Sequence, residues 1–345
     1  MKVLILGGTR FLGRQIVQEA LQRGHEVTLF NRGNNAHLFP EVETLLGDRN
    51  GELDVLKGRK WDAVIDTCGL LPKSISQAAK VLEENISHYT YISSISVYKD
   101  WIPLHITEDY PTHTLLPEEV EAISNQSQEE MLEHYGALKA LCEAEAAKEM
   151  PGKVLAVRAG MIVGPYDYTD RLPYWVKRVA EGGRILCPGN PNRPVQIIDT
   201  KDMASWILTM AQKQKTGTFN VTGPHPAITM GELLESCKQV TKSDAEFVWV
   251  QEEFLLHHHV SPWVEIPLWL PENHPLPEER IPWKGTFSFS VEKAVENDLT
   301  FRPLQEIIQD IWEWEQTRSD EKRKAGISRE KERELLELWG NITTH

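Results

Sequence analysis

Short apolar runs alternate with longer amphipathic stretches along the first half of the chain. The runs are rich in Val, Ile and Leu, as is typical of strands buried in a parallel sheet, whereas the stretches carry apolar residues at helical spacing. The pattern predicts strands at residues 3–6, 26–30, 45–46, 63–66, 89–92 and 154–157, and helices at 14–21, 74–84 and 128–149. Such alternation predicts an α/β fold, a doubly wound parallel sheet with helices on both faces.

The pattern changes at Gly164, after which prolines interrupt the periodicity. A helix at 202–212 and a strand at 219–221 are predicted to return to the sheet, while residues 251–286, crowded with Pro and Trp, predict a loop-rich lobe. The charged stretch 319–338 has few apolar positions and predicts a solvated helix. We therefore expect a sheet domain, a smaller C-terminal lobe and a charged helical extension, at residues 1–164 with returning segments at about 195–224, at 165–318 and at 319–345.

A glycine turn joins the first predicted strand to the first predicted helix. Glycines at both ends of Gly7-Gly8-Thr9-Arg10-Phe11-Leu12-Gly13 let the backbone turn tightly, and the helix N-terminus then offers free N–H groups to a pyrophosphate. A glycine pair alone is also typical of an ordinary strand-to-helix turn, so the argument depends on the strand-helix-strand context. In that context the turn predicts a Rossmann-type sheet that binds a dinucleotide against Gly7, Thr9, Arg10, Phe11, Leu12 and Gly13.

Composition disfavours several classes of function. A formal net charge of -14 opposes general binding to nucleic acid or to an anionic membrane, because both need an excess of Lys and Arg on some face. No apolar stretch approaches the ~20 residues of a membrane span, and the first strand leaves no room for a leader peptide before it, so we expect a cytoplasmic protein. The four cysteines are scattered, and His257-His258-His259 has no acidic or Cys residue at ligand spacing. We expect neither a disulfide framework nor a metal site.

A phenol and an ammonium stand four residues apart near the start of the predicted helix 128–149. On a helix Tyr135 and Lys139 share one face, although this spacing is also common among surface pairs. A tyrosine with a pKa near 10 must shift by about 3 units to act as an acid or base near pH 7, which requires roughly 4 kcal/mol of phenolate stabilisation. Lys139 and an oxidised nicotinamide ring are able to supply it. The hydroxyl of Ser94 and those of neighbouring serines follow strand 89–92 at the carboxyl edge of the sheet, where such sheets build their sites.

Together these motifs resemble the extended short-chain dehydrogenase/reductase superfamily of NAD-dependent epimerases and dehydratases, in particular reductase-like members that open Gly-Gly-Thr-Arg-Phe. The resemblance covers roughly residues 1–315 and rests, besides the glycine turn, on Ser93-Ser94 before Val97-Tyr98, on Tyr135 with Lys139, and on the segments 158–165, 198–204 and 217–221. It implies that Tyr135 is the general acid/base, that Lys139 holds the cofactor ribose and lowers the pKa of Tyr135, and that Ser94 hydrogen-bonds the substrate oxygen. It also implies a possible homodimer formed through two helices of the sheet domain.

Two departures from the family pattern bear on the cofactor. Arg10 takes the fourth position of the turn, normally glycine, and Asn31 with Arg32 ends the second strand where NAD-type members carry an acid. Without that carboxylate, Arg10 and Arg32 are both able to reach a 2′-phosphate with charge-assisted hydrogen bonds. These residues favour NADP(H); NAD is the alternative if Asn31 bonds the ribose and Arg32 is a solvated turn residue. Asp48 matches the family position near the adenine amine, or else is a turn residue.

Further departures narrow the reaction. Ile95 and Ser96 replace the Asp-Glu pair with which sugar-nucleotide dehydratases eliminate water, and Arg193 lies two residues from the position of an arginine that binds a nucleotide diphosphate. We therefore predict an NAD(P)-dependent oxidoreductase that moves a hydride to or from a carbonyl or carbinol carbon of a small molecule held by the C-terminal lobe. A nucleotide-sugar epimerase is the alternative enzyme. A non-catalytic NAD(P)-sensing or RNA-binding protein, by analogy with stem-loop binding proteins, is the alternative of another class.

Overall fold

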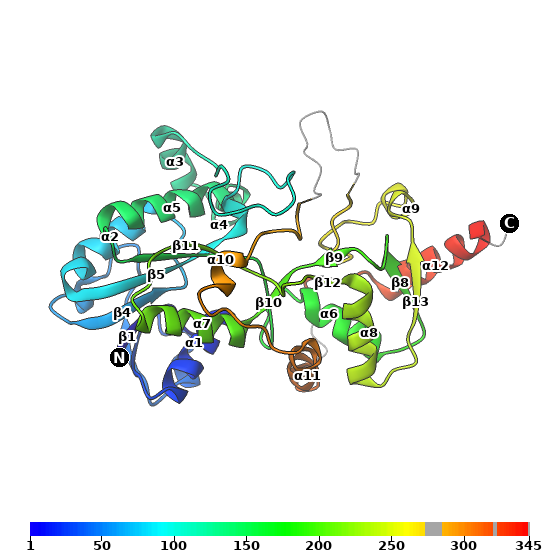
Figure 1. Ribbon diagram of the computed structural model, residues 1–345, viewed down its shortest axis with the longest axis horizontal. Coiled ribbons are helices and arrows are strands. Elements are labelled where there is room, and N and C mark those ends of the chain that lie inside the picture. The colour runs from blue at the N-terminus through cyan, green and yellow to red at the C-terminus, as the bar shows by residue number, and fades with distance from the viewer. Residues whose placement is uncertain (273–284, 320–322, 344–345) are drawn as a thin grey trace.

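A seven-stranded sheet and a second, smaller lobe lie side by side along the long axis of the molecule (Figure 1). The computed structural model describes residues 1–272, 285–319 and 323–343. Within them, no helix is long and apolar enough to cross a membrane. The N-terminus lies in the sheet half, and the C-terminus lies at the far end of the lobe (Figure 1).

The sheet is parallel throughout, with strand order β11-β6-β5-β4-β1-β2-β3. Its strands are β1 (Lys2–Leu6), β2 (Glu26–Asn31), β3 (Glu43–Leu46), β4 (Trp61–Asp66), β5 (Ile86–Ser94), β6 (Val154–Ala159) and β11 (Gly217–Val221). The predicted doubly wound sheet is therefore confirmed. Strand β1 pairs with β2 on one side and with β4 on the other, so the order of the strands reverses at β1. A reversal of this kind opens a crevice at the carboxyl edge, where ligands bind.

Helices cover both faces of the sheet because successive side chains of a buried strand point to opposite faces. Val3 and Ile5 of β1 pack with α1 (Phe11–Gln22) and α7 (Thr200–Gln212). Leu4 and Leu6 pack on the other face, with α2 (Pro72–Leu82) and α5 (Tyr135–Glu149). The stretch 128–149, expected to form one helix, contains α4 (Gln128–Glu133) and α5, separated at His134. Tyr135 is consequently the first residue of α5.

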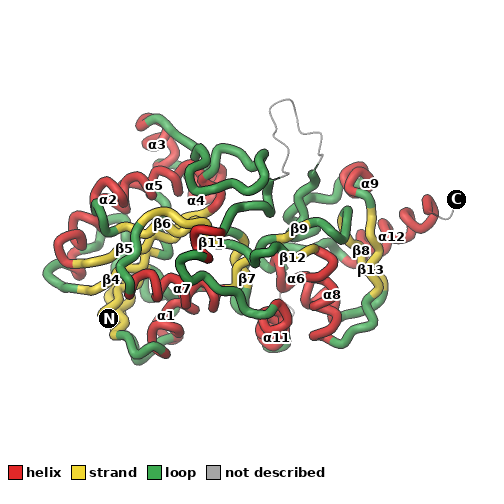
Figure 2. Tube along the Cα trace, viewed as in Figure 1, coloured by secondary structure: helices red, strands yellow, loops and turns green. Residues whose placement is uncertain are grey.

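Short strands and many loops build the lobe and its junction with the sheet half (Figure 2). Three two-stranded sheets occur there: β7 (Met161–Val163) with β10 (Ile197–Asp199), β8 (Arg184–Pro188) with β13 (Glu246–Val250), and β9 (Pro194–Val195) with β12 (Ile228–Thr229). The remaining helices are α3 (Pro117–Ser124), α6 (Arg171–Ala180), α8 (Met230–Thr241), α9 (Glu252–His257), α10 (Glu292–Val295), α11 (Leu304–Glu315) and α12 (Arg329–Thr343). Trp175 and Trp269 are buried in the core of the lobe, so tryptophans of this half pack its interior. Part of the Pro- and Trp-rich stretch 251–286, residues 273–284, lies outside the described residues.

The expectation that the charged C-terminal helix is solvated was wrong. In α12 the side chains of Leu335 and Leu336 are buried in the core of the lobe. Glu332 is also buried and forms an ion pair with Arg178 of α6, with Nε to Oε2 at 2.9 Å. A charged residue that points inward at a paired position contributes nothing to an apolar pattern, which is why the sequence pattern concealed the packing of this helix.

Candidate functional site

The glycine turn between β1 and α1 forms a cradle at the carboxyl edge of the sheet. Gly7 and Gly8 have φ of 99° and 82°, and a Cβ on Gly13 would lie 3.0 Å from the Cα of Gly8, so the turn and the helix approach as only glycine permits. Arg10 precedes α1 with an extended backbone, no side chain caps the helix, and its first turn carries no acid. The N–H groups of that turn are thus available to an anion, and the cradle fits the pyrophosphate of a dinucleotide. Thr9, Phe11 and Leu12 complete the turn as expected from the sequence.

Ser94 and Tyr135 come together beside this edge of the sheet. Ser94 ends β5, and its Oγ accepts a hydrogen bond from the Ser96 N–H at 3.1 Å. A Cβ on Gly136 would collide with the Ser96 carbonyl oxygen, so the glycine lets the start of α5 rest against this turn. Burial raises the pKa of Tyr135 to about 12, and a hydrogen bond with Ser94 opposes the rise. To act near pH 7 the phenolate therefore needs about 7 kcal/mol of stabilisation, more than a solvated tyrosine would.

Lys139 lies one helical turn after Tyr135 and is buried. Its Nζ donates hydrogen bonds to the carbonyl oxygens of Ile92 at 2.7 Å and Gly69 at 2.9 Å, and it lies 5.8 Å from the centroid of the Tyr135 ring. Burial lowers the pKa of Lys139 because it disfavours the charged form. The structure therefore brings Ser94, Tyr135 and Lys139 to one edge of the sheet, in an arrangement suited to moving a proton through the phenol.

The residues expected to select the cofactor lie around the same edge but have different partners. The Asn31 amide donates to the Gly7 carbonyl oxygen at 3.1 Å and accepts from the Gly33 N–H at 2.8 Å, so it ties the end of β2 to the turn. Arg10 lies over the ring of Tyr168, 4.8 Å from its centroid, whereas Arg32 is exposed. The expected partnership of Arg10 and Arg32 at a 2′-phosphate thus stays a prediction.

Two further polar features lie near these residues. The carboxylate of Asp48 accepts a hydrogen bond from the Asn50 N–H at 2.8 Å, as in a turn, so its expected adenine contact is likewise a prediction. Tyr168, which the sequence argument did not select, lies beside Arg10, and its proximity contributes to the raised pKa of Tyr135. Tyr168 follows Gly164, where prolines interrupt the periodic pattern, and nothing in the sequence indicated that it lies near the start of α5.

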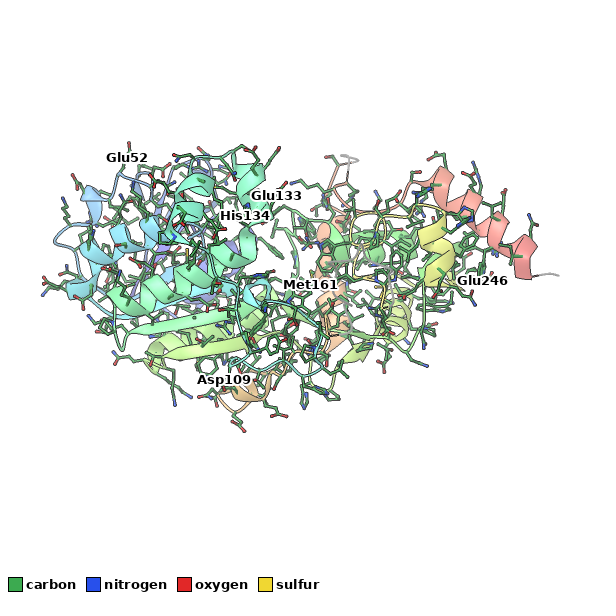
Figure 3. All side chains as sticks on the ribbon, turned by 90° about the horizontal axis from the view of Figure 1, so that it is seen from above. Glu52, Asp109, Glu133, His134, Met161 and Glu246 are labelled. Atoms are coloured by element: carbon green, nitrogen blue, oxygen red, sulfur yellow. The ribbon has the colours of Figure 1, made fainter. Side chains whose placement is uncertain are left out.

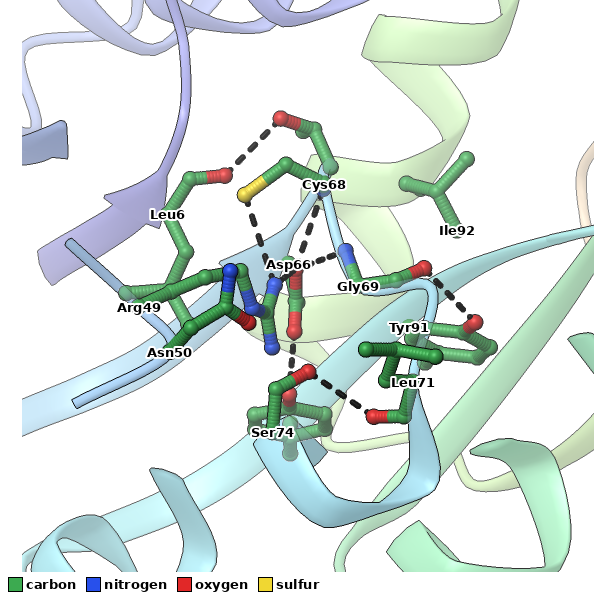
Figure 4. Close-up of polar contacts among 12 residues, drawn as sticks. Leu6, Arg49, Asn50, Asp66, Cys68, Gly69, Leu71, Ser74, Tyr91 and Ile92 are labelled. Atoms are coloured by element: carbon green, nitrogen blue, oxygen red, sulfur yellow. Dashed lines mark hydrogen bonds and ion pairs between the residues drawn. The ribbon is translucent and has the colours of Figure 1, made fainter. Parts of the chain in front are cut away.

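Sequence reasoning also missed a buried polar cluster under the site (Figure 4). Asp66 ends β4 fully buried, and its carboxylate forms an ion pair with Arg49 at 2.5 Å and accepts a hydrogen bond from the Tyr89 hydroxyl at 2.6 Å. Arg49 Nη1 also lies 3.3 Å from the sulfur of Cys68. The one available signal was Asp66 itself, an acid at the end of an otherwise apolar strand.

A small pocket lies between the sheet half and the lobe. Met161, which lies between the two halves in Figure 3, contributes to its lining. The cavity measures about 20 Å³, room for one small group, and none of the described residues that line it is charged. The hydroxyl of Thr222 in this lining is buried without a hydrogen-bond partner among the described residues. The lining residues are Ile95, Trp101, Met161, Gln196, Thr222, Trp263, Thr286, Phe287 and Phe289.

Arg193, considered for a nucleotide diphosphate, is already engaged. Its Nη1 contacts Glu252 at 2.7 Å and its Nε lies 3.7 Å from Glu272, while its side chain is only 11% exposed. Two carboxylates thus neutralise the one arginine that the sequence offered for a diphosphate. The consecutive histidines 257–259 lie at the end of α9, and within the described ranges no group of three or more His, Cys, Asp or Glu is placed to hold a metal ion.

Known proteins resemble the chain in sequence and in fold. The family model of the NAD-dependent epimerase/dehydratase family matches residues 3–222. A chloroplast stem-loop binding protein of 41 kDa from Arabidopsis thaliana is 27% identical over 68% of this chain, and the match spans 62% of that protein. A UDP-glucose 4-epimerase from Lactobacillus helveticus is 24% identical over 72% of this chain and 84% of its own. The structure of UDP-glucuronic acid 4-epimerase from Bacillus cereus in complex with NAD has a TM-score of 0.63 and 13% identity, over 92% of this chain and 99% of that one, which establishes the shared fold.

Proposed function

The chain belongs to the NAD-dependent epimerase/dehydratase family, and we propose that it passes a hydride between C4 of a nicotinamide and a carbonyl or carbinol carbon of a small molecule. It is an NAD(P)-dependent enzyme of the extended short-chain dehydrogenase/reductase type. The observation that supports the proposed reaction is the convergence of Ser94, Tyr135 and Lys139 at the sheet edge that carries the glycine turn. The bound dinucleotide supplies or accepts the hydride.

Each of the three side chains has a proposed task. Tyr135 gives its proton to the substrate oxygen during reduction and takes it back during oxidation. Ser94 donates a hydrogen bond to the same oxygen. The ammonium of Lys139, 5.8 Å from the Tyr135 ring, stabilises the phenolate and bonds the ribose next to the nicotinamide. Since the pKa of Tyr135 is raised to about 12, chiefly by burial, this positive charge is needed for proton transfer near neutral pH.

We propose that the substrate is a small, uncharged carbonyl compound. The described lining of the pocket next to Ile95 carries no charge, its cavity of about 20 Å³ suits one small group, and Arg193 is held by two carboxylates. A nucleotide diphosphate needs cations that these residues do not offer. The alternative, epimerisation of a nucleotide sugar, is supported by the named activity of the bacterial relative.

Replacing Tyr135 by phenylalanine tests the acid/base role. We expect Tyr135→Phe to lower kcat by about 10²- to 10⁴-fold, the usual contribution of a general acid/base, with little change in cofactor affinity. NAD(P)H oxidation with a panel of uncharged aldehydes and ketones, and epimerisation of UDP-glucose, are the two assays. The matched control is Tyr110→Phe, which removes a phenol whose hydroxyl donates to Asp100. Unchanged turnover of the best substrate in Tyr135→Phe would sink the role, and efficient UDP-glucose epimerisation would favour the alternative.

We propose NADP(H) as the cofactor, with NAD as the alternative. Arg32 is exposed beside Asn31 at the end of β2, where it is free to meet a 2′-phosphate. We expect Arg32→Gln to weaken NADPH binding about ten- to hundredfold, the worth of one charge-assisted hydrogen bond, and to leave NADH binding unchanged. Lys80→Gln, at an exposed position of α2, controls for loss of net charge. Tighter binding of NADH than NADPH by the unmodified protein contradicts this choice.

RNA binding is a second candidate, favoured by the name of the Arabidopsis relative. The net charge of -14 opposes it, since RNA affinity derives largely from basic contacts to phosphates. We expect a labelled RNA hairpin to show no saturable binding at 150 mM salt, and micromolar binding in fluorescence anisotropy would overturn that expectation. Assembly as a homodimer also remains a proposal, and light scattering tests it.

A further inference from the structure

The position of Lys139 depends on the loop after β4, which is not part of a strand. Its Nζ contacts two backbone carbonyl oxygens, of Ile92 within β5 and of Gly69 in the loop after β4. The Ile92 carbonyl is fixed by the sheet. The Gly69 carbonyl belongs to a residue without a side chain, whose backbone dihedrals are the least restricted of any residue, so something else must orient it.

Asp66 anchors that turn from below (Figure 4). One oxygen, Oδ1, accepts hydrogen bonds from the N–H groups of Cys68 at 3.0 Å and Gly69 at 2.9 Å. The other oxygen, Oδ2, accepts from Tyr89. The Gly69 carbonyl accepts a further hydrogen bond from the Tyr91 hydroxyl at 3.0 Å. A Cβ on Gly69 would lie 2.7 Å from Ile75 and 2.9 Å from Tyr91, so the turn is packed as well as bonded.

Arg49 keeps the anchor in its charged form. Asp66 is fully buried, which by itself disfavours a carboxylate, yet the guanidinium of Arg49 and the hydrogen bonds around the carboxyl hold the pKa of Asp66 below its usual value. The carboxylate therefore stays an acceptor for both N–H groups throughout the neutral range. Arg49 comes from the loop after β3, seventeen residues before Asp66 in sequence.

We propose that Asp66 is a positioning residue of the active site, which acts through the Gly69 backbone to place the Lys139 ammonium. Asp66 fixes the N–H of Gly69, and the carbonyl of the same residue then meets Nζ. Loss of the carboxylate leaves that carbonyl restrained only by the Tyr91 hydroxyl and the packing around it, and lets the ammonium move from the ribose that it is proposed to hold. This inference rests on the proposed function, because it assigns Asp66 to the task given there to Lys139.

Binding of two cofactor fragments tests the inference without a substrate. ADP-ribose carries the ribose next to the nicotinamide, and ADP lacks it, so the ratio of their Kd values isolates the contact assigned to Lys139. Calorimetry would compare the ratio in the wild type, in Lys139→Met, in the pair variant Arg49→Met/Asp66→Leu and in the triple variant, with the 2′-phosphorylated fragments in parallel. The pair variant removes both buried charges together, which proteins often tolerate.

We expect Lys139→Met and the pair variant each to reduce the advantage of ADP-ribose over ADP about tenfold, and the triple variant to show no greater loss than Lys139→Met. Arg49→Lys keeps both the Asp66 acceptor and a positive partner beside it, and serves as the matched control, with most of the advantage retained. Should the pair variant fail to fold, Asp66→Asn replaces it, with a smaller expected loss of about threefold because its amide oxygen still accepts.

Three outcomes overturn the inference: an unchanged ratio in the pair variant, an equal loss for ADP and ADP-ribose, or full additivity with Lys139→Met. A different result addresses the proposed function. If Lys139→Met itself leaves the advantage of ADP-ribose intact, the ribose contact assigned to Lys139 is wrong, whatever Asp66 does.

Discussion

Arg178–Glu332 in the lobe and Arg49–Asp66 in the sheet half are arginine–carboxylate pairs with little solvent exposure that are bonded very differently. In the lobe, Arg178 Nε donates to both oxygens of Glu332, and its two other nitrogens donate to the carbonyl oxygens of Gly182 and Arg184 at 2.9 and 2.6 Å. In the sheet half, Arg49 bonds Asp66 through Nη1, while its Nε and Nη2 are buried without an acceptor among the described residues. The lobe pair thus bonds every guanidinium nitrogen to protein oxygens, whereas the sheet pair reaches its carboxylate through a single nitrogen.

Breaking the lobe pair gives the largest expected effect. Glu332→Gln leaves Arg178 buried with no carboxylate opposite its Nε, and we expect a loss of about 3–5 kcal/mol in the free energy of unfolding. Urea denaturation followed by circular dichroism measures it, and Glu330→Gln on the exposed side of the same helix is the control. A loss below about 1 kcal/mol in Glu332→Gln would show that the pair does not hold the lobe together.

Low pH is expected to distinguish the two halves further, because it destabilises the sheet half through His88. This side chain is fully buried in β5, and burial lowers its pKa to about 4 from 6.5. The unfolded chain therefore takes up a proton below pH 6.5 that the folded chain refuses until about pH 4, so stability falls as pH falls through this window. The pKa of His88 differs by about 2.5 between the unfolded and folded chain, so the full loss in the free energy of unfolding is about 3 kcal/mol.

Hydrogen exchange at pH 7 and pH 4.5 is the measurement for His88. We expect protection in the strands of the sheet half to fall more than protection in α6 and α12. His88→Gln removes most of this pH dependence, whereas the exposed His105→Asn leaves it in place. Equal acid sensitivity in the wild type and His88→Gln would assign the effect to other groups.

The smallest expected effect comes from the Thr222 hydroxyl in the pocket next to Ile95. Thr222→Val keeps the shape of the side chain and removes a buried hydroxyl that has no partner among the described residues, so we expect stability to change by less than about 1 kcal/mol, or to rise. KM for a carbonyl substrate that bonds this hydroxyl should increase. Thr90→Val is the matched comparison, because its hydroxyl lies 2.8 Å from His88 Nε2 and its loss should cost about 1–2 kcal/mol. A larger loss in Thr222→Val than in Thr90→Val would refute the distinction.

The sheet and the edge that carries the site could be predicted because their signals are local. Apolar runs and the glycine turn record strand, turn and helix within a few neighbouring residues, and Tyr135 and Lys139 are related by a single turn of helix. The break at His134, which makes Tyr135 the first residue of α5, left no comparable mark.

Contacts between distant segments could not be predicted in the same way. Asp66 and Arg49 meet across a sheet, and Glu332 meets Arg178 across 154 residues of chain. In a single sequence, a charged residue that is exposed to solvent cannot be distinguished from one that is paired in a core. The distinction depends on the tertiary partner, which is why the charged terminal helix was expected in solvent and Asp66 was not selected.

The packing of α12 in the lobe also affects the order in which the two halves of the protein fold during synthesis. All seven strands of the main sheet lie before residue 222, so the sheet is synthesised well before α12, although Ala294 and Leu299 complete the core on one of its faces. The core of the lobe cannot be completed until Leu335 and Leu336 have been synthesised, because these side chains of α12 are part of that core. Until α12 has emerged from the ribosome, the lobe exposes the apolar surface that Leu335 and Leu336 later cover. We expect chaperones to bind this surface during synthesis.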